Sequence, residues 1–168
     1  MGLEEKAVTE SILIRYCLAP EYLDGKYKSH LLRFIREKYE NTSHREFGHI
    51  LDIIDIVEIT NENIMSMVPS VFFMVKVLAK LYKPKVGDEL QVPIDKIFHH
   101  GVFIVQDKVR ILVPIMMCEE YIVQKDFSSF YLQHKTTNKI FRKDDVVAIR
   151  LIEVRFEKDG FSCIAVVR

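Results

Sequence analysis

Apolar and polar residues follow two different periods along the first 40 positions of the chain. Residues 11–17 are rich in β-branched and aromatic side chains and run into Pro20, which predicts a strand and then a break. Beyond Asp24 and Gly25, apolar residues recur at helical spacing over residues 27–39. These apolar positions are Tyr27, Leu31, Phe34, Ile35 and Tyr39. The pattern therefore predicts an amphipathic helix that lies on a sheet.

Two long apolar segments follow the helix. Residues 48–57 are nearly all β-branched or leucine, and residues 71–82 form a second apolar run, so both are predicted strands. Residues 60–63 and the break at Pro69 are expected to form the connection between them. One strand, one helix and two further strands predict a small α+β domain over residues 1–82.

The clearest domain boundary is the stretch 83–88, where proline, glycine and charged residues follow a long apolar strand. Beyond it the chain consists mainly of short predicted strands, with a polar excursion over 126–143 and an Asp-Gly turn at 159–160 before the last strand. The predicted strands are 89–98, 101–106, 109–113, 146–156 and 161–167. Five short strands with an excursion after the third predict an all-β OB-type barrel over residues 83–168.

Composition and charge exclude several classes of protein. The 168 residues include 24 basic and 24 acidic side chains, so the basic footprint of a nucleic-acid-binding domain is absent at whole-chain level. Apolar runs fall well short of the roughly 20 residues of a membrane helix, so no membrane association is expected. The first residues lack the pattern of a secretory signal, and the three cysteines lack disulfide or zinc spacing. We therefore expect a protein that is not secreted.

The sequence contains no recognisable catalytic motif. The six glycines form neither a dinucleotide-binding motif nor a phosphate-binding loop, and the paired carboxylates are adjacent in sequence, which turns them apart in a strand. His99 and His100 stand at a predicted turn without further metal ligands nearby. We expect no catalytic residue, no metal and no cofactor.

The remaining candidate is a nucleic-acid surface in the second half of the chain. OB barrels bind single strands on the face of their second and third strands, with aromatic rings on bases and Lys or Arg on phosphates. The candidate residues are His99, His100, Phe103, Lys108, Arg110, Lys135, Lys139 and Arg142. The spacing leaves two interpretations level: an RNA-binding surface, or a core phenylalanine among ordinary solubility charges.

With both halves considered, the chain resembles the large stalk subunit of archaeal and eukaryotic multisubunit RNA polymerases. The similarity runs from about residue 9 to the end and rests on an ordered set of motifs. They are LAPEYL at 18–23, FGHIL at 47–51, the boundary segment 76–89, and HGVFIV at 100–105 followed by ILVP at 111–114, which is similar to an S1 signature. The chain departs from the family at residues 68–73, which lack the usual glycines, and at Pro114, where many S1 domains have histidine. Such divergence suits a viral polymerase or a lineage-specific paralogue.

This resemblance implies a non-catalytic subunit of a DNA-dependent RNA polymerase, with an N-terminal tip domain that docks on the core subunits and an S1-type OB domain that binds emerging single-stranded RNA. It also implies a small helical partner subunit over the seam between the domains, met by exposed apolar residues near Tyr82, Val86 and Ile97. A cellular eukaryotic subunit would reside in the nucleus, and a viral one in the host cytoplasm or virion.

Docking is expected through the loops 42–48 and 61–70, because loops can enter a pocket while the sheet stays rigid. The second loop is unusually apolar, which suits a docking surface, although it could equally fold onto the chain's own core. The docking candidates are Phe47, Gly48, Met65, Met67 and Pro69.

Two other classes of protein compete with this interpretation. A free-standing S1-type RNA-binding protein acting in translation or RNA decay would not need the N-terminal half. An OB-fold enzyme is disfavoured, because the sequence offers no carboxylate, metal or phosphate site.

Overall fold

The computed structural model describes residues 2–64 and 70–168. Within them the fold is mostly β, with one α-helix, and no helix is long and apolar enough to cross a membrane. The chain divides into two compact units, which we call the N-terminal unit (Ala7–Tyr82) and the C-terminal unit (Lys83–Arg168 together with residues 2–6). The short 3₁₀-helix η1 (Leu3–Lys6) thus belongs to the C-terminal unit, where Leu3 is buried.

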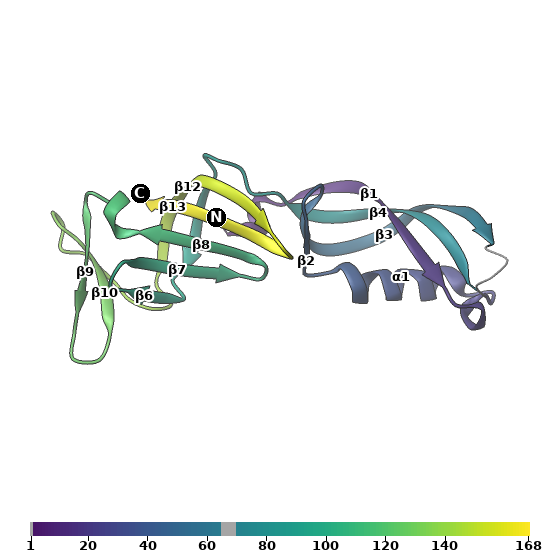
Figure 1. The fold of residues 1–168 in the computed structure, drawn as a ribbon, viewed down its shortest axis with the longest axis horizontal. Coiled ribbons are helices and arrows are strands. Elements are labelled where there is room, and N and C mark those ends of the chain that lie inside the picture. Colours follow the sequence, from purple (N-terminus) through teal and green to yellow (C-terminus); the bar gives the residue numbers. More distant parts are fainter. Residues whose placement is uncertain (1, 65–69) are drawn as a thin grey trace. The chain divides into compact units, whose positions relative to one another are not determined.

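The N-terminal unit is a four-stranded antiparallel sheet in the order β1-β4-β3-β2, with one helix (Figure 1). The helix covers residues 27–39, as its apolar spacing predicts. The elements are β1 (Val8–Leu18), η2 (Pro20–Tyr22), α1 (Tyr27–Tyr39), β2 (Thr42–His44), β3 (Gly48–Ile64) and β4 (Val71–Tyr82).

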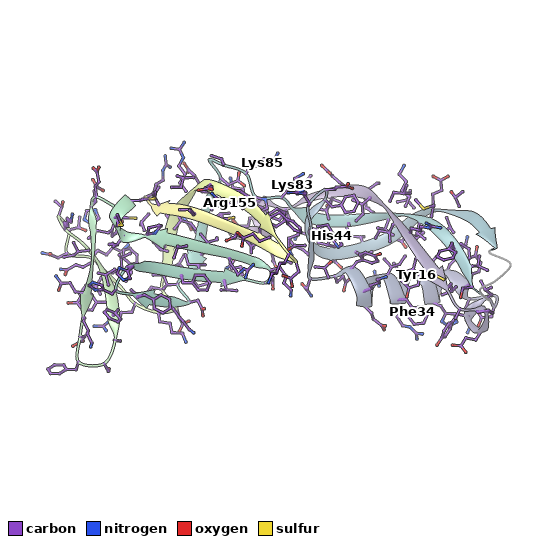
Figure 2. All side chains as sticks on the ribbon, viewed as in Figure 1. Tyr16, Phe34, His44, Lys83, Lys85 and Arg155 are labelled. Carbon is purple, nitrogen blue, oxygen red and sulfur yellow. The ribbon has the colours of Figure 1, made fainter. Side chains whose placement is uncertain are left out.

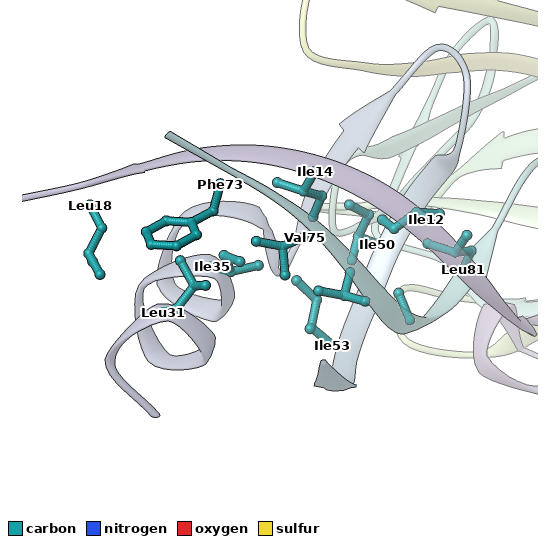
Figure 3. Close-up of a cluster of buried hydrophobic side chains, with 12 residues drawn as sticks. Ile12, Ile14, Leu18, Leu31, Ile35, Ile50, Ile53, Phe73, Val75 and Leu81 are labelled. Carbon is teal, nitrogen blue, oxygen red and sulfur yellow. The ribbon is translucent and has the colours of Figure 1, made fainter. Parts of the chain in front are cut away.

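The core of this unit lies between α1 and one face of the sheet (Figure 3). Leu31 and Ile35, one helical turn apart, are the helix residues that are fully buried there. The Arg36 guanidinium donates hydrogen bonds to the carbonyl oxygens of Ile53 and Ile54, at 2.8 and 2.7 Å, which ties the last turns of the helix to β3. The sheet contributes Ile12, Ile14, Leu18, Ile50, Ile53, Phe73, Val75, Val77, Ala79 and Leu81.

Strand β3 has an apolar period of three, which a regular strand cannot place on one face. Its register against β4 shifts after Ile50, after Ile53 and again after Ile56. Each shift is a bulge that inserts one extra residue. These bulges bring the isoleucines at every third position to the core, and the four are Ile50, Ile53, Ile56 and Ile59.

The C-terminal unit is built on a six-stranded sheet in the order β5-β12-β13-β8-β7-β6. Strands β8 and β13 are parallel, and the other neighbours are antiparallel. The two end strands, β5 and β6, are separated along the chain by Ile94 and Asp95 alone, so the sheet curls round on itself. The strands are β5 (Glu89–Pro93), β6 (Lys96–Phe98), β7 (Gly101–Gln106), β8 (Val109–Pro114), β12 (Val146–Glu157) and β13 (Gly160–Val167).

Between β8 and β12 the chain forms a second, three-stranded sheet in the order β11-β10-β9, and β10 lies against β6 (Figure 1). Its elements are η3 (Ile115–Met117), β9 (Tyr121–Lys125), β10 (Phe130–His134) and β11 (Ile140–Phe141). The excursion predicted over residues 126–143 therefore contains two strands that the sequence pattern did not reveal.

Glycine is required where strands of the C-terminal unit approach closely. A Cβ at Gly160 would lie 2.5 Å from the carbonyl oxygen of Lys108, which itself accepts a hydrogen bond from the Phe161 amide at 2.9 Å. A Cβ at Gly101 would collide with the carbonyl oxygen of Val113. Gly160, the glycine of the predicted Asp-Gly turn, is thus the first residue of β13. A glycine is needed there because the backbone of Lys108 lies so close, and not because of the conformation of the turn.

Several expectations from the sequence are wrong. Residues 60–63 do not form a loop, because β3 continues to Ile64, and residues 42–44 of the expected docking loop 42–48 form β2. Residues 89–98 form two strands instead of one. Tyr82 is buried rather than exposed, whereas Val86 is 67% exposed and Ile97 is half-buried.

Candidate nucleic-acid interface

The outer face of β7 and β8 carries the central residues of the candidate interface. Alternation along each strand sends one set of side chains to the core and the other to the surface. The core set is Val102, Ile104, Val109, Ile111 and Val113, all fully or almost fully buried. Phe103 and Arg110 belong to the opposite set, with Phe103 half-buried and Arg110 exposed. Phe103 therefore lies on the surface side of the sheet.

Neighbouring strands extend this face into a mixed apolar and basic surface. Phe103 stands opposite Leu112 on β8 and Lys96 on β6, and side chains opposite one another in a ladder share a face. Leu112 is 44% exposed and therefore adds apolar surface beside Phe103. The ladder also places Arg110 beside Val105. Lys96 and Leu112 could not be predicted from the sequence, because only strand pairing brings them next to Phe103.

The turns at the margin of this face hold the predicted histidines and Lys108. His99 and His100 are exposed in the turn between β6 and β7, with ring centroids 5.0 Å apart. The Lys108 ammonium lies 3.3 Å from the Asp159 carboxylate, which comes from the turn between β12 and β13. The hydrogen bond from Lys108 lowers the pKa of Asp159 below its ordinary value of 3.8, so the carboxylate is charged at neutral pH. Lys108 is therefore neutralised within the chain.

The small sheet β9–β11 brings the other predicted cations close to aromatic rings. The Arg142 guanidinium lies 5.4 Å from the centre of the Tyr131 ring and 3.5 Å from the carboxylate of Asp126. The Lys139 ammonium lies 4.8 Å from the centre of the Phe141 ring. Such cation–π contacts hold a positive charge beside a planar group.

Two further lysines, Lys125 and Lys135, lie in or beside this small sheet. The ammonium of Lys125 lies 5.9 Å from the centre of the Phe130 ring, so this pair repeats the arrangement of cation and ring. The Lys135 ammonium instead donates a hydrogen bond of 2.5 Å to the carbonyl oxygen of Glu119. Sequence reasoning missed the aromatic residues Phe130 and Tyr131, because the period-2 pattern of these short strands is weak.

The predicted RNA-binding residues thus occupy two neighbouring places in one unit rather than a single cluster. Five of them lie on or at the margin of the β7–β8 face, and three lie in or beside the small sheet. The first group is His99, His100, Phe103, Lys108 and Arg110, and the second is Lys135, Lys139 and Arg142.

The predicted docking residues are described only in part. Phe47 and Gly48 lie at the hairpin between β2 and β3, where the half-buried Phe47 ring is 6.0 Å from that of His44. Gly48 has a φ of 94°, a conformation that favours glycine. Met65, Met67 and Pro69 lie outside the described residues.

Across the part of the chain that the structure describes, no group of three or more His, Cys, Asp or Glu side chains is placed to hold a metal ion. Burial raises the pKa of the Cys163 thiol to about 12, which suits a core position rather than a nucleophile. No protein-family model and no curated protein matches the chain. The half-buried aromatic rings, exposed histidines and cations of this surface are groups that can contact planar bases and phosphates.

Proposed function

We propose that the chain is a non-catalytic stalk subunit of a DNA-dependent RNA polymerase, in which the N-terminal unit docks on the core subunits and the C-terminal unit binds emerging single-stranded RNA. In this proposal the C-terminal unit is an S1-type OB domain and the N-terminal unit is the tip domain. A small helical subunit would cover the exposed Val86. The subunit acts in transcription, in the nucleus of a cell or in the host cytoplasm or virion of a virus.

The strand order of the C-terminal unit is the observation that carries the proposal. When β5 and β6 are taken as one bent first strand, the sheet order becomes 1-2-3-5-4-1, with strands three and five parallel. A five-stranded barrel of this order is characteristic of the OB fold, whose second and third strands and neighbouring loops bind oligonucleotides. The Phe103 and Arg110 face lies on those two strands, and His99 and His100 occupy the loop between the first and second.

Docking is supported by the position of Phe47 at the tip of the β2–β3 hairpin. Phe47 packs partly against the core of its own unit, and the part of its ring that stays accessible can contact a pocket on a partner. Gly48 supports the same hairpin through its left-handed backbone conformation, so a substitution there would strain the hairpin and would not test docking directly.

The experiment is affinity purification of the full-length tagged chain from its source, with mass spectrometry of the proteins that co-purify. We expect the large polymerase subunits in the eluate. Phe47→Ser should reduce their recovery, whereas the matched variant Phe127→Ser, in a fully exposed residue of the C-terminal unit, should not. Recovery of ribosomal proteins or RNA-decay enzymes in place of polymerase subunits would overturn the proposal in favour of a free-standing S1-type protein.

A filter-binding assay with single-stranded RNA tests the second half of the proposal. Phe103→Leu combined with Arg110→Ala removes a ring and a charge from the β7–β8 face while keeping an apolar side chain at position 103. We expect at least a fivefold loss of affinity, because one stacked base alone contributes that much. Unchanged RNA binding would contradict the assignment of this face.

A further inference from the structure

A row of aromatic rings runs along the margin between α1 and the β1 side of the N-terminal unit. The Tyr16 and Phe34 rings are nearly parallel, with centroids 6.5 Å apart, and Tyr22 meets Phe34 edge-on at 4.8 Å. Figure 2 shows Tyr16 and Phe34 next to each other on β1 and α1. Tyr39 continues the row toward His44, with their ring centroids 5.7 Å apart. We call Tyr16, Tyr22, Phe34 and Tyr39 the aromatic stripe.

Sequence spacing explains why the stripe forms on this side of the helix. His30, Phe34 and Lys38 are four residues apart, so they share one face of α1, beside the face that buries Leu31 and Ile35. The Tyr22 ring also lies 5.5 Å from that of His30. All four rings of the stripe are half-buried, so each is held by the core and still reaches the surface.

Two exposed cations lie on the stripe. The Lys38 ammonium is 5.5 Å from the centre of the Tyr16 ring and 5.4 Å from that of Tyr39, so it links Tyr39 to the rest of the row. The Arg33 guanidinium lies 4.8 Å from the centre of the Phe34 ring. Over residues 27–39 the helix carries four basic side chains and one acidic side chain, although the whole chain has no net charge. Arg33 and Lys38 are the two of these basic residues that lie over stripe rings, while burial and then the nearby Glu37 carboxylate raise the pKa of Tyr16.

Rings that alternate with exposed cations are what a single-stranded nucleic acid needs, because its bases stack and its phosphates require positive charge. Aromatic residues and arginine are also enriched in protein interfaces, but lysine is depleted there, and the Lys38 ammonium lies over two of these rings. We propose that the aromatic stripe, with Arg33 and Lys38, binds single-stranded nucleic acid. It is a second site, beyond the RNA surface of the C-terminal unit, and it stands on separate residues.

The test measures binding of the full-length chain to fluorescein-labelled 12-mers of single-stranded RNA and single-stranded DNA. Arg33→Ala with Lys38→Ala should lower the slope of log K against log salt by about 1.4, since each phosphate contact on a single strand contributes about 0.7. Phe34→Leu keeps the core filled but removes a stacking ring, and should weaken binding about fivefold or more. The chain has seven tyrosines and no tryptophan, and three of the tyrosines belong to the stripe, so loss of stacking there should appear as less quenching of tyrosine fluorescence in the stripe variants than in the parent chain.

The matched control is Lys76→Ala with Lys80→Ala, which removes the same charge from the other face of the sheet, because Val75, Val77 and Ala79 alternate with these lysines toward the core. Each stripe variant is also measured together with the Phe103→Leu and Arg110→Ala substitutions. A further loss of nucleic-acid affinity in that background supports an independent site. If the stripe variants lower the affinity and the Phe103 and Arg110 substitutions do not, the stripe is supported as a binding site and the C-terminal surface is not.

Three results would overturn the inference. The first is unchanged nucleic-acid affinity in the Arg33 and Lys38 double variant, which we expect to fold normally, as circular dichroism would check, because both side chains are exposed. The second is an equal loss in the lysine control. The third is intact nucleic-acid binding with lost capture of polymerase subunits, which would assign the stripe to a protein partner.

Discussion

Removing the carboxylate of Asp159 is expected to strengthen RNA binding and its salt dependence. Asp159 lies 3.3 Å from the Lys108 ammonium at the margin of the β7–β8 face, and the hydrogen bond from Lys108 lowers the pKa of the Asp159 carboxyl. Lys108 is therefore unavailable to a phosphate while the pair holds. The variant Asp159→Asn retains the shape of the turn and releases the cation.

The magnitude follows from counting phosphates. One released lysine allows one further phosphate contact, which adds about 0.7 to the slope of log K against log salt for a single strand. Between 50 and 200 mM salt the variant should therefore lose about 2.6-fold more affinity than the parent chain. Fluorescence anisotropy with a labelled single-stranded RNA 12-mer, repeated at five salt concentrations, measures both slopes.

Two companion variants make the result specific. Glu4→Gln changes the net charge by the same amount at an exposed position of the same unit and should leave the slope unchanged. Lys108→Ala should have little effect alone, yet it should abolish the gain in the Asp159→Asn background. An unchanged slope in Asp159→Asn, or an equal rise in Glu4→Gln, would refute the assignment of Lys108 to the RNA surface.

Three other predictions concern the stability and reactivity of the fold. Burial raises the pKa of Cys163 to about 12, whereas Cys17 is exposed. A thiol reagent at pH 8 should therefore titrate one cysteine in the folded chain and all three after unfolding. Rapid labelling of Cys163 in the folded chain would contradict its burial. Gly160→Ala should destabilise the chain by about 1–3 kcal/mol in urea unfolding, because its Cβ would meet a carbonyl oxygen at 2.5 Å, whereas Gly25→Ala, with open space around it, should not. Burial lowers the pKa of His44 below 6.5, so its contribution to stability is complete above pH 6.5 and is lost as the pH falls through the lowered pKa; an NMR titration midpoint above 6.5 would refute this.

Local periodicity predicted the elements whose geometry is regular. The helix over residues 27–39 is confirmed with both ends in place, because its apolar residues, charged background and flanking Asp-Gly agree with one another. Strand β4 is confirmed over residues 71–82 for the same reason. In these two segments the apolar residues follow a single period, so the type of secondary structure can be predicted without knowing which other part of the chain packs against them.

Periodicity does not predict the strands that are irregular. Strand β3 places an isoleucine at every third position, and only bulges against β4 make that spacing compatible with one buried face. A sequence pattern cannot reveal a bulge without the partner strand, and so the segment 60–63 was wrongly expected to be a loop. The short strands β10 and β11 escaped prediction because they are stabilised by pairing with β9, which local spacing does not encode.

Long-range neighbours limited the prediction of the candidate site. Lys108 and Asp159 are 51 residues apart in sequence, and their ion pair changes what Lys108 can contribute. Tyr16 and Phe34 come from a strand and a helix whose contact is visible only in the folded unit. The residue types indicate that the surface can bind bases and phosphates. Which cations already form ion pairs, and which rings lie together, depends on contacts between distant parts of the sequence.

The zero net charge of the chain conceals a segregation of charge that matters for binding. Residues 121–143 carry five basic side chains and one acidic side chain, whereas β3 carries four acidic residues and no Lys or Arg. Two of those acids, Asp52 and Glu58, stand opposite Lys80 and Lys76 on β4. Affinity for a polyanion depends on the cations that reach phosphates rather than on the sum over the chain. A neutral protein can therefore bind single strands, and its salt slope measures how many of its cations are free to do so.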